Sequence, residues 1–384
     1  MRILISVQNY HPAYSFGGRV INAVALAEGL HGLGHDVEVV TSTVIERDSI
    51  PSRCTYRDCI NGVNVTYLGT WLRIKGVSLN PSVLPFALSH IGRFDAVYII
   101  GLYDILGAAV AFAARRAGVP YVVEPSGMLI PIVQSLRLKR AYHFIFGRPM
   151  LNGARAVVVT SQIEWDDALR FGIPREKLFL SRNGINLEEY KSLPHRGVFR
   201  RRLGISDDVS LILWLGRIEA KKNLEQLIEA LAGLKHYSWA LAIVGPSESP
   251  DYLNSLKWLA GELGIEDRLW FVSGLYNGDK LAAYGDADIF VLVSVNENWG
   301  HAAIEAIASG VPVLVTRTCG VAGFVEGRAG LVVDRSVTDI RAGLERLMAD
   351  SDLYRRFKLQ LPDLVSELSW DKPVRERANL FQSC

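Results

Sequence analysis

One carboxylate, Glu305, lies in a segment that is otherwise apolar on every side. Small and aliphatic residues surround it from Ala302 to Ala308, so a helix here is expected to be buried. Gly310 and Pro312 should end that helix. A buried carboxylate without a partner is costly, and no Lys or Arg lies within two turns along the chain. Its partner must therefore be distant in sequence or be a bound ligand.

A second carboxylate, Glu297, precedes this helix in a polar loop. Residues 288–293 form a short apolar run that is typical of a strand buried on both faces. Open α/β sheets bind ligands at the carboxyl ends of their strands, and the N–H groups near Gly300 and His301 suit an anion. Two hydrogen-bond-accepting carboxylates beside such a site suit a polyhydroxylated phosphate ester. The alternative is a structural ion pair, because the spacing alone is weak evidence.

A second apolar run, 211–215, leads into a glycine turn and a basic loop. Arg217 and Lys222 would lie at the end of this strand, where a guanidinium and an ammonium can bind a phosphate. Asn223 is expected to cap the helix that follows, whose leucines recur with helical period. Two solvated cations on a surface loop are the alternative.

These segments resemble a known family. The chain is similar to the retaining glycosyltransferases of family 4, also called group 1, which have the two-domain GT-B architecture. The matching segments are Gly17-Gly18, the linker sequence Asn183-Gly184-Ile185, residues 216–223, and Glu297 to Glu305 followed by residues 310–313. The resemblance implies an α/β protein in which two Rossmann-like parallel-sheet domains face a central cleft.

The resemblance also implies an activity. It is the transfer of a sugar, with retention of configuration, from a nucleotide-diphospho-sugar to a glycan or a polyprenyl-pyrophosphate-linked acceptor in surface polysaccharide biosynthesis. No cofactor or metal is expected, because Arg217 and Lys222 would stabilise the departing diphosphate. Glu305 would bind the ribose diol and Glu297 the donor-sugar hydroxyls. The remaining donor-binding candidates are Gly17, Gly18, Gly216, Gly274, Asn298, Trp299, Gly300 and His301.

The acceptor side departs from the family pattern. Ser126 stands where many relatives have His or Arg. Glu124 could act as a base nearby, or could be a buried acceptor for backbone amides. His11 and Asp104 follow predicted strands and are further candidates, although a lone histidine is more often structural.

A chain of 384 residues is too long for one ordinary domain, and its 49% hydrophobic content supports large cores. Two domains are therefore expected. The family resemblance implies an acceptor-binding domain at 1–188, a nucleotide-sugar-binding domain at 189–366, and a final helix within 367–384 that crosses back to the first domain. Strands are predicted at 2–7, 36–42, 63–68, 95–100, 119–123, 156–160, 178–181, 211–215, 240–244, 269–272, 288–293, 312–315 and 330–333.

Charge and targeting signals bear on location. No apolar run approaches the roughly 18 residues needed to span a bilayer, and the first residues lead directly into a strand. The four cysteines match no zinc or redox spacing, so we expect a cytoplasmic protein. Between Cys59 and Ile163, ten Lys and Arg residues face three acids, a net charge of +7 against +2 for the whole chain. This stretch suits an anionic membrane surface or a lipid pyrophosphate, with a solvated face as the alternative.

The sequence gives less support to other binding partners and other protein classes. No nucleic-acid-binding module accompanies the basic stretch, so nucleic acid is not expected. A dehydrogenase is disfavoured because the first strand lacks a Gly-x-Gly-x-x-Gly turn. A nucleotide-sugar epimerase of the same fold, or a non-catalytic nucleotide-sugar binder suggested by Ser126, remain alternatives.

Overall fold

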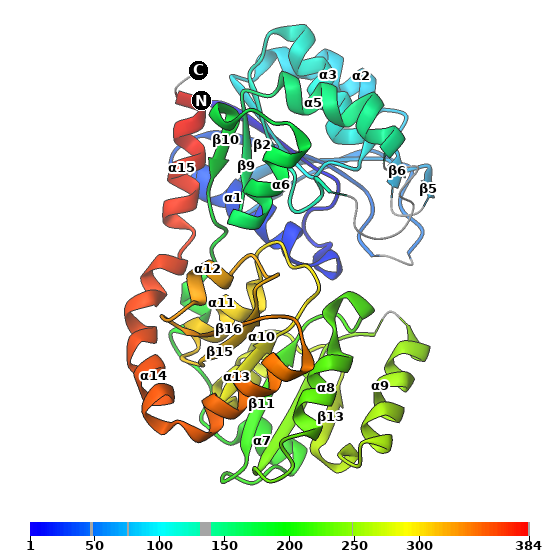
Figure 1. Ribbon diagram of the computed structural model, residues 1–384. Coiled ribbons are helices and arrows are strands. Elements are labelled where there is room, and N and C mark those ends of the chain that lie inside the picture. Colours follow the sequence, from blue (N-terminus) through cyan, green and yellow to red (C-terminus); the bar gives the residue numbers. More distant parts are fainter. Residues whose placement is uncertain (47–48, 75–76, 131–139, 248, 383–384) are drawn as a thin grey trace. The chain divides into compact units, whose positions relative to one another are not determined.

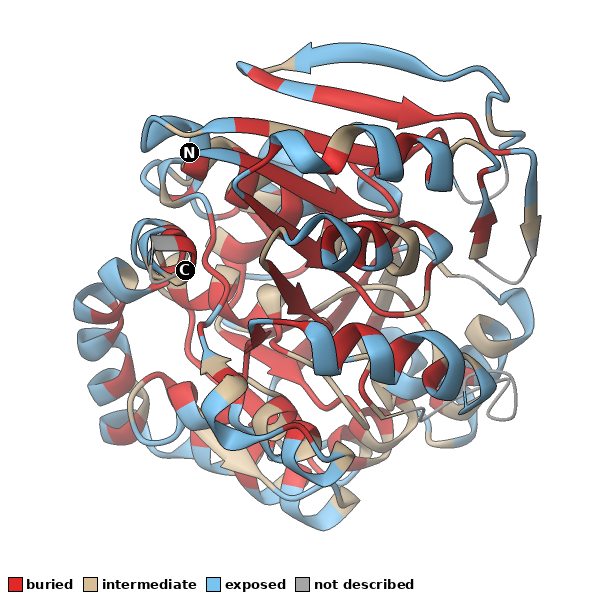
Figure 2. Ribbon diagram, turned by 90° about the horizontal axis from the view of Figure 1, so that it is seen from above, coloured by how far each residue is buried: buried red, intermediate tan, exposed pale blue. Residues whose placement is uncertain are grey.

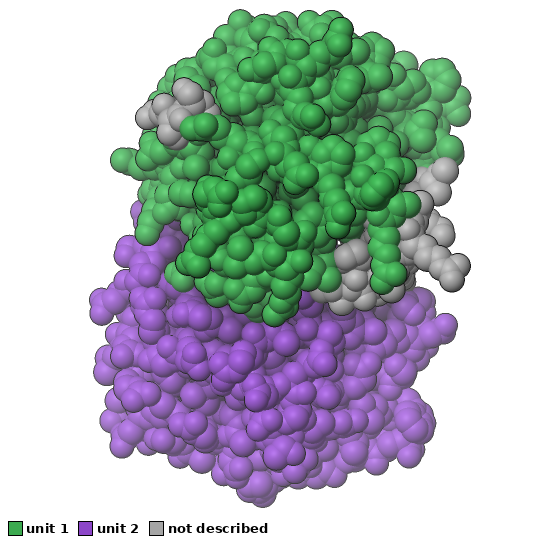
Figure 3. Space-filling view, turned by 45° about the horizontal axis from the view of Figure 1, so that its top comes forward, with its two compact units in different colours: residues 1–184, 370–384 green, residues 185–369 purple. Residues whose placement is uncertain are grey.

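The computed structural model describes residues 1–46, 49–74, 77–130, 140–247 and 249–382. The chain divides into two compact units, one formed by residues 1–184 and 370–384 and the other by residues 185–369 (Figure 3). In both units most strands are buried, whereas the helices have buried inner faces and exposed outer faces (Figure 2). No described helix is both long enough and apolar enough to cross a membrane.

The first unit contains an eight-stranded sheet in the order β10-β9-β8-β7-β1-β2-β4-β3, in which only β3 is antiparallel to its neighbour. The chain leaves β1 toward β2 on one side and returns to β7 on the other, so strand order reverses between β1 and β7. A separate two-stranded hairpin joins β5 and β6. The strands are β1 (Arg2–Val7), β2 (Asp36–Ser42), β3 (Tyr56–Ile60), β4 (Val63–Leu68), β5 (Leu72–Ile74), β6 (Val77–Leu79), β7 (Ala96–Ile100), β8 (Tyr121–Glu124), β9 (Ala156–Val159) and β10 (Leu178–Leu180).

Helices cover both faces of this sheet. One apolar core lies beneath α1 and α15, and the other beneath α2, α3 and α5 (Figure 1). Helix α15 packs closely on α1, since a Cβ at Gly29 would lie 2.5 Å from Val374 Cγ2. The helices are η1 (Tyr14–Phe16), α1 (Gly18–Gly32), α2 (Val83–His90), η2 (Ile91–Arg93), α3 (Ile105–Ala117), the π-helical η3 (His143–Gly147), α5 (Arg148–Gly153), α6 (Gln162–Phe171), η4 (Arg175–Lys177) and α15 (Asp371–Gln382).

The second unit contains a six-stranded, fully parallel sheet in the order β13-β12-β11-β14-β15-β16. Strand order reverses between β11 and β14. The strands are β11 (Ser210–Leu215), β12 (Trp239–Val244), β13 (Leu269–Val272), β14 (Ile289–Leu292), β15 (Val313–Thr316) and β16 (Gly330–Val333). The helices are η5 (Leu187–Tyr190), α7 (Val198–Leu203), η6 (Ala220–Lys222), α8 (Leu224–Ala232), α9 (Pro250–Glu262), η7 (Glu266–Arg268), α10 (Asn277–Asp286), α11 (His301–Ala308), α12 (Ala322–Val325), α13 (Val337–Ala349), α14 (Ser351–Val365) and η8 (Ser366–Leu368).

The predicted α/β class and parallel sheets are confirmed. Every predicted strand is present, with its ends shifted by no more than two residues. The sequence missed β3, β5 and β6. Strand β3 is an edge strand whose residues 56–59 are exposed, so it lacks the apolar face on which the prediction depends.

Candidate active site

The loops that follow β11 and β14 meet at the point where strand order reverses in the second unit. Chains leaving a parallel sheet at such a point turn to opposite faces and leave a crevice between them. Two hydrogen bonds join these loops. Val295 N donates to Lys221 O at 2.8 Å, and Asn223 Nδ2 donates to Val293 O at 3.2 Å. These hydrogen bonds hold the two loops together, so the candidate site residues on one loop lie close to those on the other.

Lys222 and Glu297 form an ion pair across this point. Their side chains are 12% and 24% exposed, so the pair is accessible from solvent. Burial acts to raise the pKa of Glu297, but the paired Lys222, with Lys221 and His301 nearby, lowers that pKa below its ordinary value. The Glu297 carboxylate is thus held ionised.

Arg217 lies on the same loop, immediately after Gly216. Its Nη2 is 3.4 Å from Glu219 Oε1, and Lys221 Nζ is 3.3 Å from the same oxygen. The Arg217 side chain is 31% exposed. The loop after β11 therefore presents a group of cations that a single carboxylate within the loop only partly balances.

Glu305 has the distant partners that the sequence required. Lys280 Nζ donates to Glu305 Oε1 at 3.1 Å, and Tyr284 Oη donates to Oε2 at 2.8 Å. Lys280 also donates to Tyr190 Oη at 3.2 Å. Burial and the Glu305 charge raise the pKa of Tyr284 and of Tyr190, so both phenols stay protonated. The carboxylate side chain is still 12% exposed.

Sequence reasoning did not identify Lys280 or Tyr284. They lie one helical turn apart on α10, more than twenty positions before Glu305, so no local spacing connects them to it. The available signal was indirect. A carboxylate in the apolar α11 required a donor from a neighbouring helix, and α10 is the helix that immediately precedes β14.

The start of α11 depends on Gly300. This residue has φ +108°, and a Cβ there would lie 3.1 Å from both Leu292 Cδ2 and Val321 Cγ1. Asn298 precedes this turn and His301 is the first helical residue; both are partly buried. The helix dipole gives this end partial positive charge, which favours an anion.

Glycines also shape the ends of the strands. Gly245, which the sequence analysis did not single out, has φ +152°, and a Cβ there would lie only 1.7 Å from Gly216 O. The segments that follow β11 and β12 are therefore in direct backbone contact. Gly274 follows β13 at the edge of the sheet, where a Cβ would lie 3.2 Å from Tyr276 Oη.

Two expectations for this unit need correction. Trp299 packs in the hydrophobic core with 3% exposure, so its side chain is buried rather than presented to a ligand. Asn223 lies at the start of α8, but its side chain makes no capping hydrogen bond. With φ +60°, it turns instead toward Val293 O and Gln226 Oε1.

The candidates in the first unit are placed at that unit's own strand ends. Gly17 has φ +84° and precedes Gly18, the first residue of α1. His11 is partly buried, and its carbonyl oxygen accepts a hydrogen bond from Tyr67 Oη at 2.5 Å. This hydrogen bond joins the loop after β1 to strand β4 of the sheet.

Asp104 is a helix cap rather than an acceptor-facing carboxylate. Its Oδ1 accepts from Gly107 N at 2.5 Å at the start of α3, and the residue is 3% exposed. Burial raises the pKa of Asp104, although the Gly107 hydrogen bond and the nearby Arg19 oppose that rise. The strand-end position that suggested a functional role is explained by capping.

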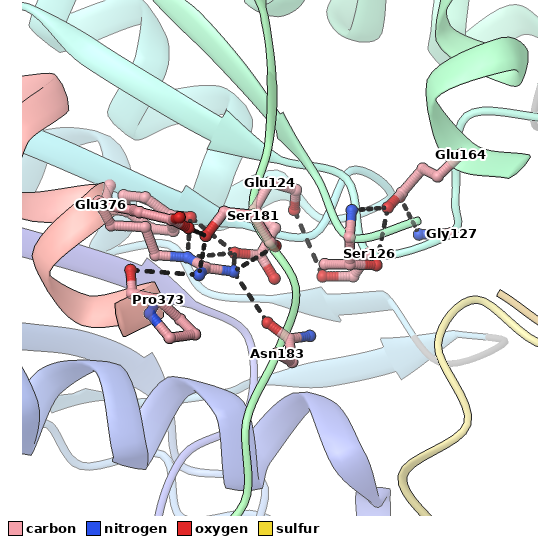
Figure 4. A network of polar contacts seen from close by, with 11 residues as sticks. Glu124, Ser126, Gly127, Glu164, Ser181, Asn183, Pro373 and Glu376 are labelled. Carbon is pink, nitrogen blue, oxygen red and sulfur yellow. Dashed lines mark hydrogen bonds and ion pairs between the residues drawn. The ribbon is translucent and has the colours of Figure 1, made fainter. Parts of the chain in front are cut away.

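Glu124 is part of a buried network (Figure 4). Its Oε2 accepts from Tyr98 Oη at 2.6 Å and lies 3.2 Å from Arg377 Nη2, and both partners of the ion pair are almost fully buried. Arg377, on α15, also donates to Ser181 Oγ at 2.8 Å and to Asn183 Oδ1 at 2.8 Å. The suggested role of Glu124 as a base is therefore wrong; it holds the last helix to the sheet.

Ser126 adopts φ +54° in the turn after β8, and its Oγ donates to Glu124 O at 3.4 Å. The turn is held by Glu164, which sequence reasoning missed (Figure 4). Glu164 accepts from Gly127 N at 2.5 Å and from Thr160 N at 2.8 Å. Burial, opposed by these hydrogen bonds, raises its pKa to about 7. The available signal was the Ser161-x-x-Glu164 spacing of a capping box.

No group of three or more His, Cys, Asp or Glu side chains suited to a metal ion occurs among the described residues. Cys54 and Cys59 are exposed and Cys319 is buried, all three as free thiols, while Cys384 lies outside the described residues.

Two family models match the chain in succession. A glycosyl transferase 4-like domain covers residues 17–184, and the glycosyl transferases group 1 family covers residues 196–360. An uncharacterized glycosyltransferase of Methanocaldococcus jannaschii is 26% identical, covering 100% of this chain and 98% of the relative. The GDP-mannose:cellobiosyl-diphosphopolyprenol alpha-mannosyltransferase of Komagataeibacter xylinus is also 26% identical, covering 100% of this chain and 93% of the relative.

Solved structures agree with this result. Anabaena HepE in complex with UDP superposes with a TM-score of 0.80 at 19% identity, covering 100% of both chains. WaaG, a glycosyltransferase involved in lipopolysaccharide biosynthesis, superposes with a TM-score of 0.70 at 18% identity, covering 99% of both chains. Both likenesses show the GT-B fold. The two family matches, which together span most of the sequence, show that the chain belongs to the GT4-type glycosyltransferases.

Proposed function

We propose that the protein is a retaining, metal-independent hexosyltransferase that uses a nucleotide-diphospho-sugar and acts on a glycan or lipid-linked acceptor in surface polysaccharide biosynthesis. The observation that carries this proposal is the accessible Lys222–Glu297 pair beside the start of α11, at the reversal of strand order in the second unit. Such a position collects cations, acceptors and a helix dipole around one crevice.

The nucleoside is expected to bind at Glu305. Its carboxylate is oriented by Lys280 and Tyr284 and retains some exposure, so it can accept hydrogen bonds from the two hydroxyls of a ribose. Related proteins differ in the base: HepE was solved with UDP-glucose, starch synthase IV of Arabidopsis thaliana with ADP, and the Komagataeibacter relative uses GDP-mannose. The base must therefore be measured for this protein.

The leaving diphosphate is expected to bind between Arg217, Lys222 and the start of α11. Negative charge grows on the diphosphate as the sugar departs, and pre-positioned cations stabilise that charge without a divalent metal. Lys222 is paired with Glu297 in this structure. A bound diphosphate would give Lys222 a second anionic partner, and Glu297, held ionised, could then accept hydrogen bonds from donor-sugar hydroxyls.

The acceptor is expected to be handled by the first unit and to be presented at a membrane surface. The relative from Komagataeibacter xylinus acts on a diphosphopolyprenol-linked sugar. The basic stretch of this chain suits such a lipid pyrophosphate and peripheral attachment to the inner face of the cell membrane. Lys75, Arg137 and Lys139 of that stretch lie outside the described residues.

Thermal unfolding with a panel of UDP, GDP and ADP compounds tests the donor site. We expect nucleotides of one base to raise the melting temperature of the native chain. Glu305→Ala should lower the affinity for those nucleotides about tenfold or more. Glu305→Gln tests the need for charge, and Glu262→Ala, an exposed glutamate on α9, is the matched control. No shift with any nucleotide, or an equal shift in Glu305→Ala, would contradict the proposed site.

Two further measurements address the chemistry. Turnover of the donor identified above should persist in EDTA, because the cations replace a metal; loss of turnover that added Mg²⁺ or Mn²⁺ restores would contradict metal independence. The anomeric configuration of the first-formed product, followed by NMR, should match that of the donor. Inversion would contradict a retaining mechanism.

A further inference from the structure

An apolar groove runs between α2, α3 and the segment formed by η3 and α5 in the first unit. It encloses about 440 Å³. Figure 1 shows these helices side by side on one face of the sheet. Its walls are mainly hydrocarbon, including Leu84, Ala108, Phe112, Ile145 and Phe146. This groove is separate from the nucleotide site, which lies in the other unit.

Four large apolar side chains at the groove are exposed. Phe112 is 55% exposed and Ile145 is 58% exposed, with Leu84 and Phe146 at 45% and 47%. Single exposed apolar residues are ordinary, but contiguous large ones around a groove mark a binding surface. The described residues of the groove thus form a surface suited to a hydrocarbon ligand.

The groove is elongated along α3. Its lining residues on this helix run from Ile105 to Arg115 at helical spacing, about 15 Å along the axis at the standard rise. Ile105 directly follows Asp104 at the carboxyl end of β7, next to the reversal of strand order in this sheet. One end of the groove therefore lies at the sheet edge where α/β units bind ligands.

The opposite end of the groove is cationic. Arg115 lines it, and Arg116 follows on the same helix with an exposed side chain. Arg148 begins α5, and α2, α3, η3 and α5 contain no Asp or Glu. Cations beside an apolar surface favour contact with anionic lipid.

We propose that this groove binds the isoprenoid chain of a lipid-linked acceptor. The chain would leave an anionic membrane surface at the Arg115 end and run along α3, bringing its phosphorylated end to the carboxyl edge of β7. An acceptor chain explains both ends of the groove, whereas a bulk membrane lipid explains only the cationic end. The inference rests on the proposed lipid-linked acceptor and adds the place where its hydrocarbon part binds.

Flotation of the full chain with vesicles tests this assignment. One set contains phosphatidylcholine with undecaprenyl phosphate, and the other replaces that lipid with phosphatidylglycerol at the same mole fraction. We expect the native chain to prefer the first set about tenfold. Ala108→Trp, which fills the groove, and Phe112→Ser, which removes an exposed wall, should abolish the preference. Trp258→Ser removes an exposed apolar side chain of the other unit and should leave it unchanged.

The outcomes are separable from those of the donor site. Equal binding of the native chain to both vesicle sets would overturn the proposal in favour of general membrane attachment. An undiminished preference in both groove variants would overturn it as well. A nucleotide-induced melting shift that persists in both groove variants would show that they are folded. Failure of that shift in the native chain counts against the proposed donor site, whatever the vesicles show.

Discussion

The two units have parallel sheets with the same kind of reversal in strand order, but they use charge differently there. In the second unit, the ion pairs Lys222–Glu297 and Lys280–Glu305 keep between 12% and 24% exposure on each side chain. In the first unit, Asp104 caps a helix, and the pair Glu124–Arg377 is almost completely buried. A similar topology thus supports a reachable charge cluster in one unit and a sealed one in the other.

The difference has an energetic meaning. A buried ion pair gains little net stability, but removing one partner leaves an uncompensated charge that is expensive. A partly exposed pair costs less to open, so its members can exchange their partner for a ligand. The comparison separates charged residues that hold the fold from those that are available to a substrate.

The largest expected effect is in the sealed pair. Arg377→Met should lower the free energy of unfolding by about 3–5 kcal/mol, because Glu124 would remain buried without its cation. Arg375→Met, which changes an exposed arginine of the same helix, should have little effect. Urea denaturation checks this result. Equal stability of the two variants would show that the buried network does not hold α15, and Glu124→Gln in the Arg377→Met background should recover part of the loss.

The next effect is expected at the accessible Lys222–Glu297 pair, where the loss is in reaction rate rather than in stability. Lys222→Ala should reduce kcat for donor turnover about 10²–10³-fold, since a positioned charge on the leaving group is lost. The neighbouring Lys221→Ala is the control, because Lys221 is 42% exposed and pairs with Glu219. Steady-state release of nucleoside diphosphate measures both. Comparable rates in the two variants would show that Lys222 does not take part in the reaction.

A smaller effect concerns the buried acid that holds the Ser126 turn. Burial raises the pKa of Glu164 to about 7, so the folded state binds a proton more tightly than the unfolded chain does. Stability should therefore fall as pH rises from about 5 to about 8, by about 2–3 kcal/mol. Glu164→Gln should flatten this dependence, whereas Glu176→Gln, at an exposed site, should not. Parallel pH profiles for native chain and Glu164→Gln would contradict the assignment.

The smallest effect is expected from one hydroxyl. Tyr284→Phe removes the 2.8 Å hydrogen bond to Glu305 but keeps the packing of the ring. Nucleotide affinity should fall by about threefold to tenfold, equivalent to ~1 kcal/mol. Calorimetric titration with the preferred nucleotide measures it, with Tyr237→Phe as the control outside this site. An unchanged affinity would mean that Lys280 alone orients the carboxylate.

The sequence predicted the central strands well because strands buried on both faces consist of continuous apolar residues. It also predicted that Glu305 needs a distant partner, since a charge in an apolar helix cannot remain unpaired. It left the role of Glu124 open between a base and a buried acceptor, although it assigned the similarly placed Glu297 to the donor site. Both acids end or follow apolar runs, and only the tertiary structure shows that Arg377 covers Glu124 while Glu297 stays accessible. Trp299 was misjudged for the same reason, because spacing does not indicate which way a side chain in a loop points.

The Glu124–Arg377 contact joins residues 253 positions apart, on either side of a contiguous second unit. During synthesis from the N-terminus, Glu124 therefore leaves the ribosome long before its cation exists. The second unit can complete its sheet while the first still lacks its last helix. Until residues 370–382 emerge, the nascent first unit exposes the apolar face that α15 will cover. Chaperone binding to ribosome-bound chains should therefore concentrate on this early unit and end when the final helix docks.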